Sequence, residues 1–241
     1  MSQLKLSMLK ACVASTVLIA VAAEAFGQAP APTGQTTQAL PGPAVPARPE
    51  KVVENFVPVT DAMLREPKPE DWLLFRGNQQ GWGYSPLEQI NKQNVKSLQL
   101  VWARAMEPGT NEITPIVHDG IMYLGNPSDV IQAIDAATGE LIWDYHHPLP
   151  PRASFPSIWG QRKRSITLYG NYVIFATWNN HVVALDARTG KLVWQNDRRG
   201  DLFESNSSGP IVANGMVIAG STCQVAGHGC YVTGHDVRNG E

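Results

Sequence analysis

The sequence predicts an all-β fold built from repeated four-stranded antiparallel sheets, and three observations support this. The first is an internal repeat of about 50 residues. The second is a pair of turn motifs that recurs in each repeat between short apolar runs. The third is that no segment between the repeats has the 3.6-residue apolar period of a helix. Parallel βαβ units and helical solenoids both need such helices, so the sequence argues against them.

The repeat is clearest at a turn of the form Asp-Ala-x-Thr-Gly. Its aspartates are Asp135, Asp186 and Asp236, spaced 51 and then 50 residues apart, and the third copy has Asp-Val-Arg-Asn-Gly. Asp and Thr side chains bond nearby backbone groups, and Gly accepts the positive φ that closes such a turn. The first two copies continue to Trp143 and Trp194. We expect these tryptophans to pack between neighbouring sheets.

A second turn lies upstream of each aspartate. It falls in segments 115–123, 168–175 and 210–218, which carry Asp-Gly, Gly-Asn and Asn-Gly. Such pairs favour two-residue hairpin turns. Short strands on both sides of the two turns make each repeat a four-stranded blade, and this repeat length is typical of β-propellers. We therefore expect a partial propeller of about three blades over residues 67–241.

The N-terminal region has a different composition. Residues 1–25 resemble an export signal, because a weakly basic start precedes the apolar run 11–23 and Ala23-Glu24-Ala25 suits cleavage near Ala25. An uncleaved membrane anchor is the alternative. Residues 26–66 form a Pro/Ala-rich linker and N-terminal extension, and we expect ordered structure to start near Asp71. The signal predicts an exported protein.

Charge and cysteine content narrow the class further. The formal net charge of −2 lacks the clustered basic excess of nucleic-acid-binding proteins, so no nucleic-acid partner is expected. Once the signal is removed, Cys223 and Cys230 remain. An even number of cysteines in an exported chain favours a disulfide, with two reduced thiols as the alternative.

Residues ahead of the first full repeat carry the motifs that point to a family. These are segments 71–78 (DWLLFRGN), 81–91 (GWGYSPLEQIN) and 94–102 (NVKSLQLVW). Together with the Asp-Ala-x-Thr-Gly-x-x-x-Trp repeats, they resemble the N-terminal part of a pyrroloquinoline-quinone (PQQ) dependent alcohol dehydrogenase of the methanol/ethanol type. The resemblance covers residues 67–241, less than half of the family's eight-bladed ring.

The resemblance implies an enzyme that oxidises an alcohol substrate in the periplasm. In the family, PQQ lies in the central channel over a Ca²⁺ or a lanthanide, and electrons pass to a cytochrome c. The catalytic aspartate of the family would lie beyond residue 241, so we expect no catalytic residue in this chain and no turnover from it alone. A complementing C-terminal chain is then a candidate partner. The alternatives are a non-catalytic PQQ-like propeller that serves as a protein-binding scaffold, and a non-functional remnant.

Four residues match cofactor-binding positions of the family. Glu112 stands three residues before Pro115, where the family has a PQQ-contacting glutamate, and Arg164 matches the arginine of Asn-Arg-Gly-x-x-x-Tyr-Gly. A guanidinium suits a carboxylate-rich cofactor because it bonds carboxylates bidentately. Ser207 and Thr222 match hydroxyl positions. The alternatives are a solvated turn residue for Glu112, a surface cation for Arg164 and ordinary turn formers for the two hydroxyls.

The sequence departs from the family at the metal site and at its cysteines. The family's metal-binding glutamate falls on Val225, or on Gln224 after a one-residue slip. Valine cannot bind a hard cation, so we assign no metal ligand here. The family's vicinal cysteine pair is absent before Arg164, while Cys223 and Cys230 flank the altered loop. We expect a Cys223–Cys230 disulfide to rigidify that loop.

We assign no functional site to the remaining basic residues near Arg164 or to the histidines. We expect solvated surface positions for Arg152, Arg162 and Lys163. The histidines lack metal-ligand spacing, and we expect surface or turn positions for His118, His146, His147, His181, His228 and His235.

Overall fold

The computed structural model describes residues 51–149, 163–198, 206, 208–221 and 230–241. They fall within one compact unit, Ala47–Glu241. Helical structure in the described residues is limited to α1 (Asp61–Arg65) and the short 3₁₀ helices η1 (Val95–Ser97) and η2 (Pro127–Asp129). None of the helices in these residues is long and apolar enough to cross a membrane.

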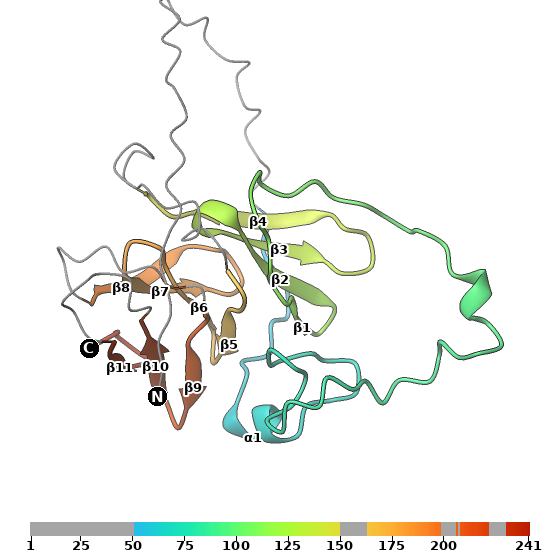
Figure 1. Cartoon of the computed structure of the whole chain (residues 1–241), viewed down its shortest axis with the longest axis horizontal. Coiled ribbons are helices and arrows are strands. Elements are labelled where there is room, and N and C mark those ends of the chain that lie inside the picture. Colours follow the sequence, from blue (N-terminus) through green and yellow to red (C-terminus); the bar gives the residue numbers. More distant parts are fainter. Residues whose placement is uncertain (1–50, 150–162, 199–205, 207, 222–229) are drawn as a thin grey trace, which may run out of the picture. The chain divides into compact units, whose positions relative to one another are not determined.

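The strands form three antiparallel sheets, packed in chain order (Figure 1). Blade 1 has the order β1-β2-β3-β4 and consists of β1 (Ile116–His118), β2 (Ile121–Asn126), β3 (Val130–Asp135) and β4 (Leu141–His146). Blade 2 has the order β5-β6-β7-β8 and consists of β5 (Thr167–Tyr169), β6 (Tyr172–Ala176), β7 (His181–Asp186) and β8 (Leu192–Asp197). Blade 3 has the order β11-β10-β9 and consists of β9 (Ile211–Ala213), β10 (Met216–Gly220) and β11 (Val232–Asp236). The predicted all-β fold of antiparallel blades is confirmed.

The turns form as the repeat motifs predict. Asp119 and Gly120 adopt φ of 46° and 78° between β1 and β2, as a two-residue hairpin turn requires. In the second turn, Asp135 Oδ1 accepts hydrogen bonds from the backbone N–H groups of Ala137 and Thr138 at 2.9 and 2.8 Å. The bonds from Thr138 hold the pKa of the Asp135 carboxyl below its usual range. The motif therefore closes each blade through its own side chains.

Each blade also holds the next one through its tryptophan. Trp143 in β4 donates from Nε1 to the carbonyl of Ala187 at 3.0 Å, and its indole covers Gly190. The indole lies so close that a Cβ added to Gly190 would fall 2.5 Å from Trp143. Trp194 in β8 repeats this arrangement on blade 3, with an equivalent hydrogen bond to the carbonyl of Val237 at 2.9 Å. The expectation that these tryptophans pack between sheets is confirmed.

Trp102 makes the same contact on the other flank of blade 1. Its Nε1 donates to the carbonyl of Ala136 at 3.1 Å, and a Cβ on Gly139 would lie 2.5 Å from its ring. Residues 100–105 (LVWARA) also match the sequence of β4 and β8 around their tryptophans. Segment 100–105 therefore contacts blade 1 in the way that β4 contacts blade 2. It occupies the position of the outer strand of a preceding blade.

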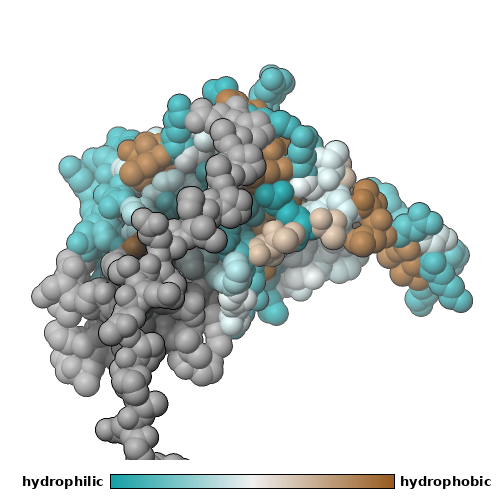
Figure 2. All heavy atoms as spheres, turned by 90° about the horizontal axis from the view of Figure 1, so that it is seen from above, coloured by the Kyte–Doolittle hydropathy of each residue, from teal (hydrophilic) through white to brown (hydrophobic). Residues whose placement is uncertain are grey.

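That segment pairs with no strand among the described residues. Leu100 and Val101 are 84% and 81% exposed, and Leu98 is exposed beside them. They belong to an arm that projects from the blades and carries η1, with apolar side chains along its surface (Figures 1 and 2). On the opposite flank, blade 3 exposes apolar residues such as Ile211 and Val232. Both flanks of the three-blade stack thus present uncovered apolar surface.

Ordered structure starts earlier than the sequence predicts. Val53 donates its N–H to the carbonyl of Arg188 at 2.9 Å, and Val59 pairs with Gly170. Val53, Val59 and Leu64 are buried in the same core cluster as the strands of blades 1 and 2. The expected start near Asp71 is therefore wrong, because a sparse set of apolar residues anchors an otherwise polar segment to blade 2.

Gly190→Ala tests the indole contact between blades. We expect it to lower the free energy of unfolding by about 1–3 kcal/mol more than a glycine-to-alanine change at a similar φ in open space, because the Trp143 ring must move. Gly120→Ala is the matched control, since Gly120 has φ 78° and no atom within 4 Å of an added Cβ, against φ 69° at Gly190. Urea unfolding of both variants measures the difference. Equal losses would contradict the indole contact as a close-packed joint.

Candidate functional site

Two of the four predicted cofactor-binding residues meet in the structure. Arg164 Nε donates to Glu112 Oε2 at 2.9 Å, although the residues are 52 positions apart. Glu112 lies in the segment that leads into β1, and Arg164 in the segment that leads into β5. The backbone N–H of Thr114 donates to the carbonyl of Arg164 at 3.1 Å and joins the two segments. The pair therefore spans the boundary between blades 1 and 2.

This pair is partly exposed. The side chains of Arg164 and Glu112 are 46% and 31% exposed. An ion pair with this exposure adds only about 0–1 kcal/mol to stability. Its chemical contribution is an oriented guanidinium beside a carboxylate, which suits a planar ligand that carries carboxylate and carbonyl oxygens.

Lys163, next to Arg164, is buried, so its predicted solvated position is wrong. Its Nζ lies 2.6 Å from Asp129 Oδ1, and both side chains are 4% exposed. The Nζ also donates to the carbonyl of Ala176 and lies 5.3 Å from the centre of the Phe175 ring. Burial is possible because the carboxylate, the carbonyl and the ring face replace the water that a lysine loses. Arg152 and Arg162 lie outside the described residues.

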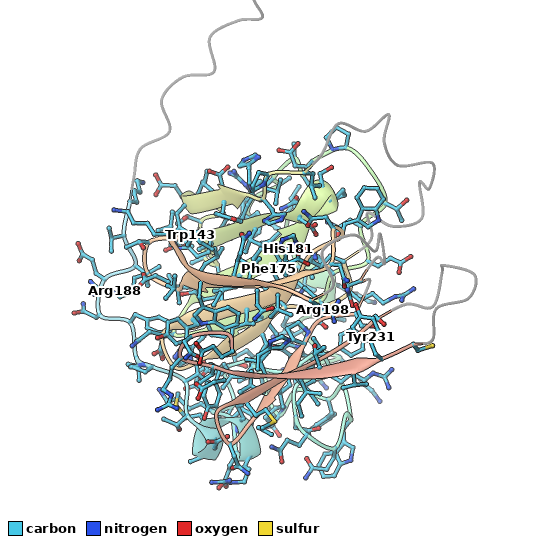
Figure 3. All side chains as sticks on the ribbon, turned by 90° about the vertical axis from the view of Figure 1, so that its left-hand side faces the viewer. Trp143, Phe175, His181, Arg188, Arg198 and Tyr231 are labelled. Atoms are coloured by element: carbon cyan, nitrogen blue, oxygen red, sulfur yellow. The ribbon has the colours of Figure 1, made fainter. Side chains whose placement is uncertain are left out.

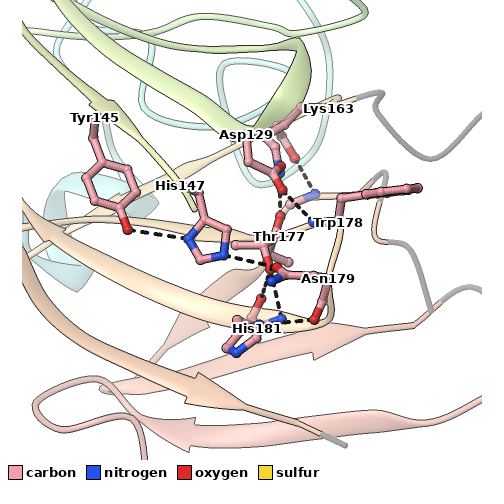
Figure 4. Close-up of polar contacts among 11 residues, drawn as sticks. Asp129, Tyr145, His147, Lys163, Thr177, Trp178, Asn179 and His181 are labelled. Carbon is pink, nitrogen blue, oxygen red and sulfur yellow. Dashed lines mark hydrogen bonds and ion pairs between the residues drawn. The ribbon is translucent and has the colours of Figure 1, made fainter. Parts of the chain in front are cut away.

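A hydrogen-bonded network surrounds this ion pair (Figure 4). His147 Nε2 lies 3.0 Å from Asn179 Oδ1, and its Nδ1 lies 3.3 Å from the Tyr145 hydroxyl. The amide oxygen is an acceptor and the hydroxyl can donate, so the partners suit a neutral imidazole with its proton on Nε2. Burial lowers the pKa of His147 and raises that of Tyr145. Thr177 completes the network with a bond to Asn179 Oδ1 at 2.7 Å.

A second bridge of this kind joins blades 2 and 3. Arg198 donates to Asn180 Oδ1 at 2.7 Å and to the carbonyl of Gly220 at 3.1 Å. Its guanidinium lies 5.6 Å from the centre of the Tyr231 ring, and the two side chains lie together in Figure 3. Asn180 and Asp129 occupy equivalent places, each directly before the third strand of its blade. The sequence analysis missed both residues, although each is a polar residue in a turn between two apolar strands.

Three histidines contradict the prediction of surface or turn positions. His118, His147 and His235 are buried. His118 Nδ1 lies 3.1 Å from Asp71 Oδ2 and its Nε2 lies 2.8 Å from the carbonyl of Val57. His146 is exposed as expected, His181 is half-buried, and His228 lies outside the described residues.

His118 also belongs to a cluster that the sequence spacing did not reveal. Ligand atoms of Asp71, His118 and Asp119 lie within 4.8 Å of one another. Asp71 Oδ1 accepts from the backbone N–H of Asp119 at 3.0 Å, and both imidazole nitrogens of His118 face oxygen atoms of the protein. These bonds tie residues 57 and 71 to the β1–β2 hairpin, and we assign the cluster to packing.

The remaining predicted site residues fall outside the described residues. They are Ser207, Thr222, Cys223 and Val225. Their predicted roles stay predictions. Cys230 is described and is disulfide-bonded, while its predicted partner Cys223 is not described.

The comparisons decide the family. Residues 72–241 match the family model described as glucose/ethanol/alcohol dehydrogenase, β-propeller domain. The chain belongs to this family. The suspected resemblance to PQQ-dependent alcohol dehydrogenases is therefore confirmed, and the family consists of oxidoreductases.

Relatives and solved structures agree with this assignment. The dehydrogenase subunit of a quinone alcohol dehydrogenase from Gluconacetobacter polyoxogenes is 34% identical over 64% of this chain and 22% of its own length. The quinoprotein alcohol dehydrogenase PedH of Pseudomonas putida is 36% identical over 66% of this chain and 27% of its own length. The quinohemoprotein alcohol dehydrogenase of Comamonas testosteroni superimposes with a TM-score of 0.65 at 32% identity, over 76% of this chain and 28% of that structure. The chain thus spans about a quarter of the relatives it matches.

The burial of His147 predicts how the stability of this protein depends on pH. Burial lowers the pKa of His147, so the unfolded chain binds the proton more strongly than the folded chain does. The contribution to stability is complete above the ordinary pKa of 6.5 and is lost as the pH falls through the lower folded value. Burial also lowers the pKa of His235, so this residue changes the stability in the same direction.

We therefore expect the free energy of unfolding to fall between about pH 8 and pH 5, and His147→Gln to reduce that slope. His146→Gln is the matched control, because His146 is the exposed neighbour. Urea unfolding across this pH range measures both slopes. An unchanged slope in His147→Gln would show that His147 is not the titrating group.

Proposed function

We propose that this chain forms the N-terminal part of a quinone site for PQQ-dependent oxidation of an alcohol. The carrying observation is the Arg164–Glu112 pair at the boundary between blades 1 and 2, in a chain of this family. Curated relatives are named as quinone or quinoprotein alcohol dehydrogenases, which supports both the reaction class and the cofactor. PQQ supplies the redox chemistry when bound, as the acceptor of the substrate's hydride.

The residues of the pair fit this cofactor. Arg164 presents a guanidinium to the carboxylates of the quinone, and the 2.9 Å bond from its Nε to Glu112 sets the plane of that guanidinium. Glu112 is held beside it through the backbone bond between Thr114 and Arg164. We infer that these residues bind and orient the quinone, with Ser207 and Thr222 as further hydrogen-bonding groups.

At the position predicted to bind the metal that accompanies PQQ in the family, this chain has no suitable ligand. The predicted ligand position holds Val225, whose side chain has no oxygen donor. In the described cluster of Asp71, His118 and Asp119, the atoms that could bind a metal are engaged in hydrogen bonds that pack the hairpin. We therefore assign no ligand for Ca²⁺ or a lanthanide to this chain and derive no catalytic role from one.

The location and partners of the whole protein are part of the proposal. The predicted export signal in residues 1–25 supports a periplasmic location. A relative from Thauera butanivorans is named 1-butanol dehydrogenase (cytochrome c), which supports a cytochrome c as electron acceptor. The uncovered flanks of the stack, at Leu100 and at Ile211, support the need for further blades in the same or a complementing chain. We propose that the three blades alone bind the quinone but do not turn over.

Arg164→Lys tests the cofactor assignment. We expect the chain to bind PQQ saturably, and the dissociation constant to rise by about tenfold or more in this variant, because an ammonium cannot bond a carboxylate bidentately. Arg238→Lys is the matched control, since Arg238 also pairs with a carboxylate but is 82% exposed on blade 3. Absorbance or calorimetric titration measures the affinity.

The same titration with Ca²⁺ or La³⁺ present is expected to give an unchanged affinity for PQQ, because Val225 replaces the predicted metal ligand.

Equal weakening of PQQ binding by Arg164→Lys and Arg238→Lys would contradict the site. A correctly folded chain that does not bind PQQ would instead favour the protein-binding scaffold.

The disulfide proposal has its own measurement. We propose that Cys223 is the partner of Cys230, which would close a loop next to the predicted hydroxyl ligand Thr222. Intact mass after alkylation is expected to show no modified thiol in the exported chain, and two after reduction. Cys230→Ser is expected to expose one alkylatable thiol, and peptide mapping should place it at Cys223. Two free thiols in the untreated exported protein would refute the pairing.

A further inference from the structure

We propose that the buried Lys163–Asp129 pair positions Arg164 and thereby tunes the affinity of the site for the quinone. The inference rests on the proposed function, because it gives Lys163 and Asp129 a role at that same site. Neither residue is assigned to contact the cofactor. They act through the backbone and the orientation of Arg164.

The first argument is the way in which the segment is held. Lys163 directly precedes Arg164, and its ammonium is fixed by Asp129 Oδ1 at 2.6 Å and by the carbonyl of Ala176. On the other side, the carbonyl of Arg164 accepts the N–H of Thr114 at 3.1 Å. Asp129 and Thr114 belong to the blade 1 side of the boundary, and Ala176 ends β6 of blade 2. The chain at residues 163 and 164 is therefore fixed to both blades that form the site.

The second argument is the backbone of the loop that presents Asp129. Ser128 and Asp129 adopt φ of 64° and 55°, a left-handed conformation that non-glycine residues take at an energetic cost. Asp129 is held there by its own contacts, since its Oδ2 accepts the N–H of Trp178 at 2.6 Å and its carbonyl accepts the N–H of His147 at 3.3 Å. The strained turn places the carboxylate against Lys163 and blade 2 (Figure 4).

The third argument concerns what a buried ion pair provides. Desolvation offsets most of the attraction between two buried charges, so an apolar pair of similar volume would stabilise the boundary about equally well. Charged hydrogen bonds differ from apolar contacts in being directional. Lys163 has oxygen acceptors from two elements, Asp129 and Ala176, and these fix where its ammonium lies. The pair is thus suited to set the position of the adjacent Arg164.

The boundary between blades 2 and 3 supplies an internal comparison. There, Arg198 follows β8 of blade 2, donates to the neutral amide of Asn180 in its own blade at 2.7 Å and reaches blade 3 through the carbonyl of Gly220 at 3.1 Å. That bridge is buried and joins two blades, as the Lys163 bridge does, but its cation is not adjacent to Arg164 in the chain. Arg198→Met is therefore the matched control for Lys163→Met, since each removes one buried inter-blade cation.

A double-mutant cycle separates positioning from a general loss of structure. The PQQ dissociation constant would be measured for the full chain, for Lys163→Met, for Arg164→Lys and for the double variant. We expect Lys163→Met alone to weaken binding about tenfold, the size typical when a partner that orients a ligand-binding residue is removed. In the Arg164→Lys background, we expect the same change to have almost no effect, because Lys163 acts through the arginine. Equal losses in both backgrounds would overturn the proposal.

A measurement without quinone keeps this inference distinct from the proposed function. The Nε–H resonance of Arg164 in ¹⁵N-labelled chain is identified by its absence in Arg164→Lys. We expect its exchange with solvent to be about tenfold faster or more in Lys163→Met and unchanged in Arg198→Met. An unchanged exchange rate of the Arg164 Nε–H in Lys163→Met would overturn the positioning role even if PQQ binds. A faster exchange in a chain that does not bind PQQ would support positioning while refuting the cofactor.

A milder variant covers the case in which Lys163→Met does not fold. Asp129→Asn keeps the shape of the side chain and an acceptor for the Trp178 N–H, but removes the negative charge that faces Lys163. We expect the same acceleration of Arg164 Nε–H exchange, of smaller size, and again no acceleration in the control Arg198→Met. A folded Asp129→Asn chain with wild-type exchange and wild-type PQQ affinity would overturn the proposal.

Discussion

The stack depends on one contact, the indole of each blade placed against a glycine and a carbonyl of the next. Trp143 and Trp194 make this contact within the stack, each with an Nε1–H bond and a glycine that leaves no room for a Cβ. The large indole buries apolar area between the sheets, and its one polar atom is satisfied by a backbone carbonyl. Because the contact involves the turn motif itself, a single repeated sequence both closes a blade and docks it.

The same contact explains the exposed arm. Trp102 already occupies its glycine on blade 1, so this residue is docked while the neighbouring Leu100 and Val101 remain exposed. In blade 1, the corresponding strand β4 pairs with β3, and its Ile142 and Trp143 are buried. The arm lacks such a pairing within the described residues. Its apolar exposure therefore follows from an incomplete blade, and no separate binding surface is needed to explain it.

Much of the fold could be predicted from the sequence, because its signals are local. The turn at Asp135 is specified by side chains three residues away at most, and the spacing of its copies sets the blade length. The pairing of Glu112 with Arg164 could be expected from the family alone, since both are assigned to one cofactor. The N-terminal segment was harder to predict, because the apolar residues that anchor it, such as Val53, Val59 and Leu64, are scattered through a polar sequence.

The parts of the site that could not be predicted depend on partners far apart in the chain. Lys163 appears solvated in sequence because nothing near it carries a negative charge, and its partner Asp129 lies 34 residues earlier. His118 is buried between Asp71 and the carbonyl of Val57, which precede it by 47 and 61 residues. A charge or a titratable ring can be buried only where distant elements supply acceptors. Sequence patterns with short periods contain no information about such acceptors.

These buried polar groups and the indole contacts act on the same boundary. The indole of Trp143 sets how blade 2 packs on blade 1, and the Lys163–Asp129 pair fixes the ends of the strands at that boundary. The Arg164–Glu112 bond crosses it, so its geometry depends on the relative placement of the two blades. An exposed ion pair is too weak to impose that placement. Orientation of the arginine must therefore come from the packed and buried contacts around it, and the binding site is a consequence of how the blades dock.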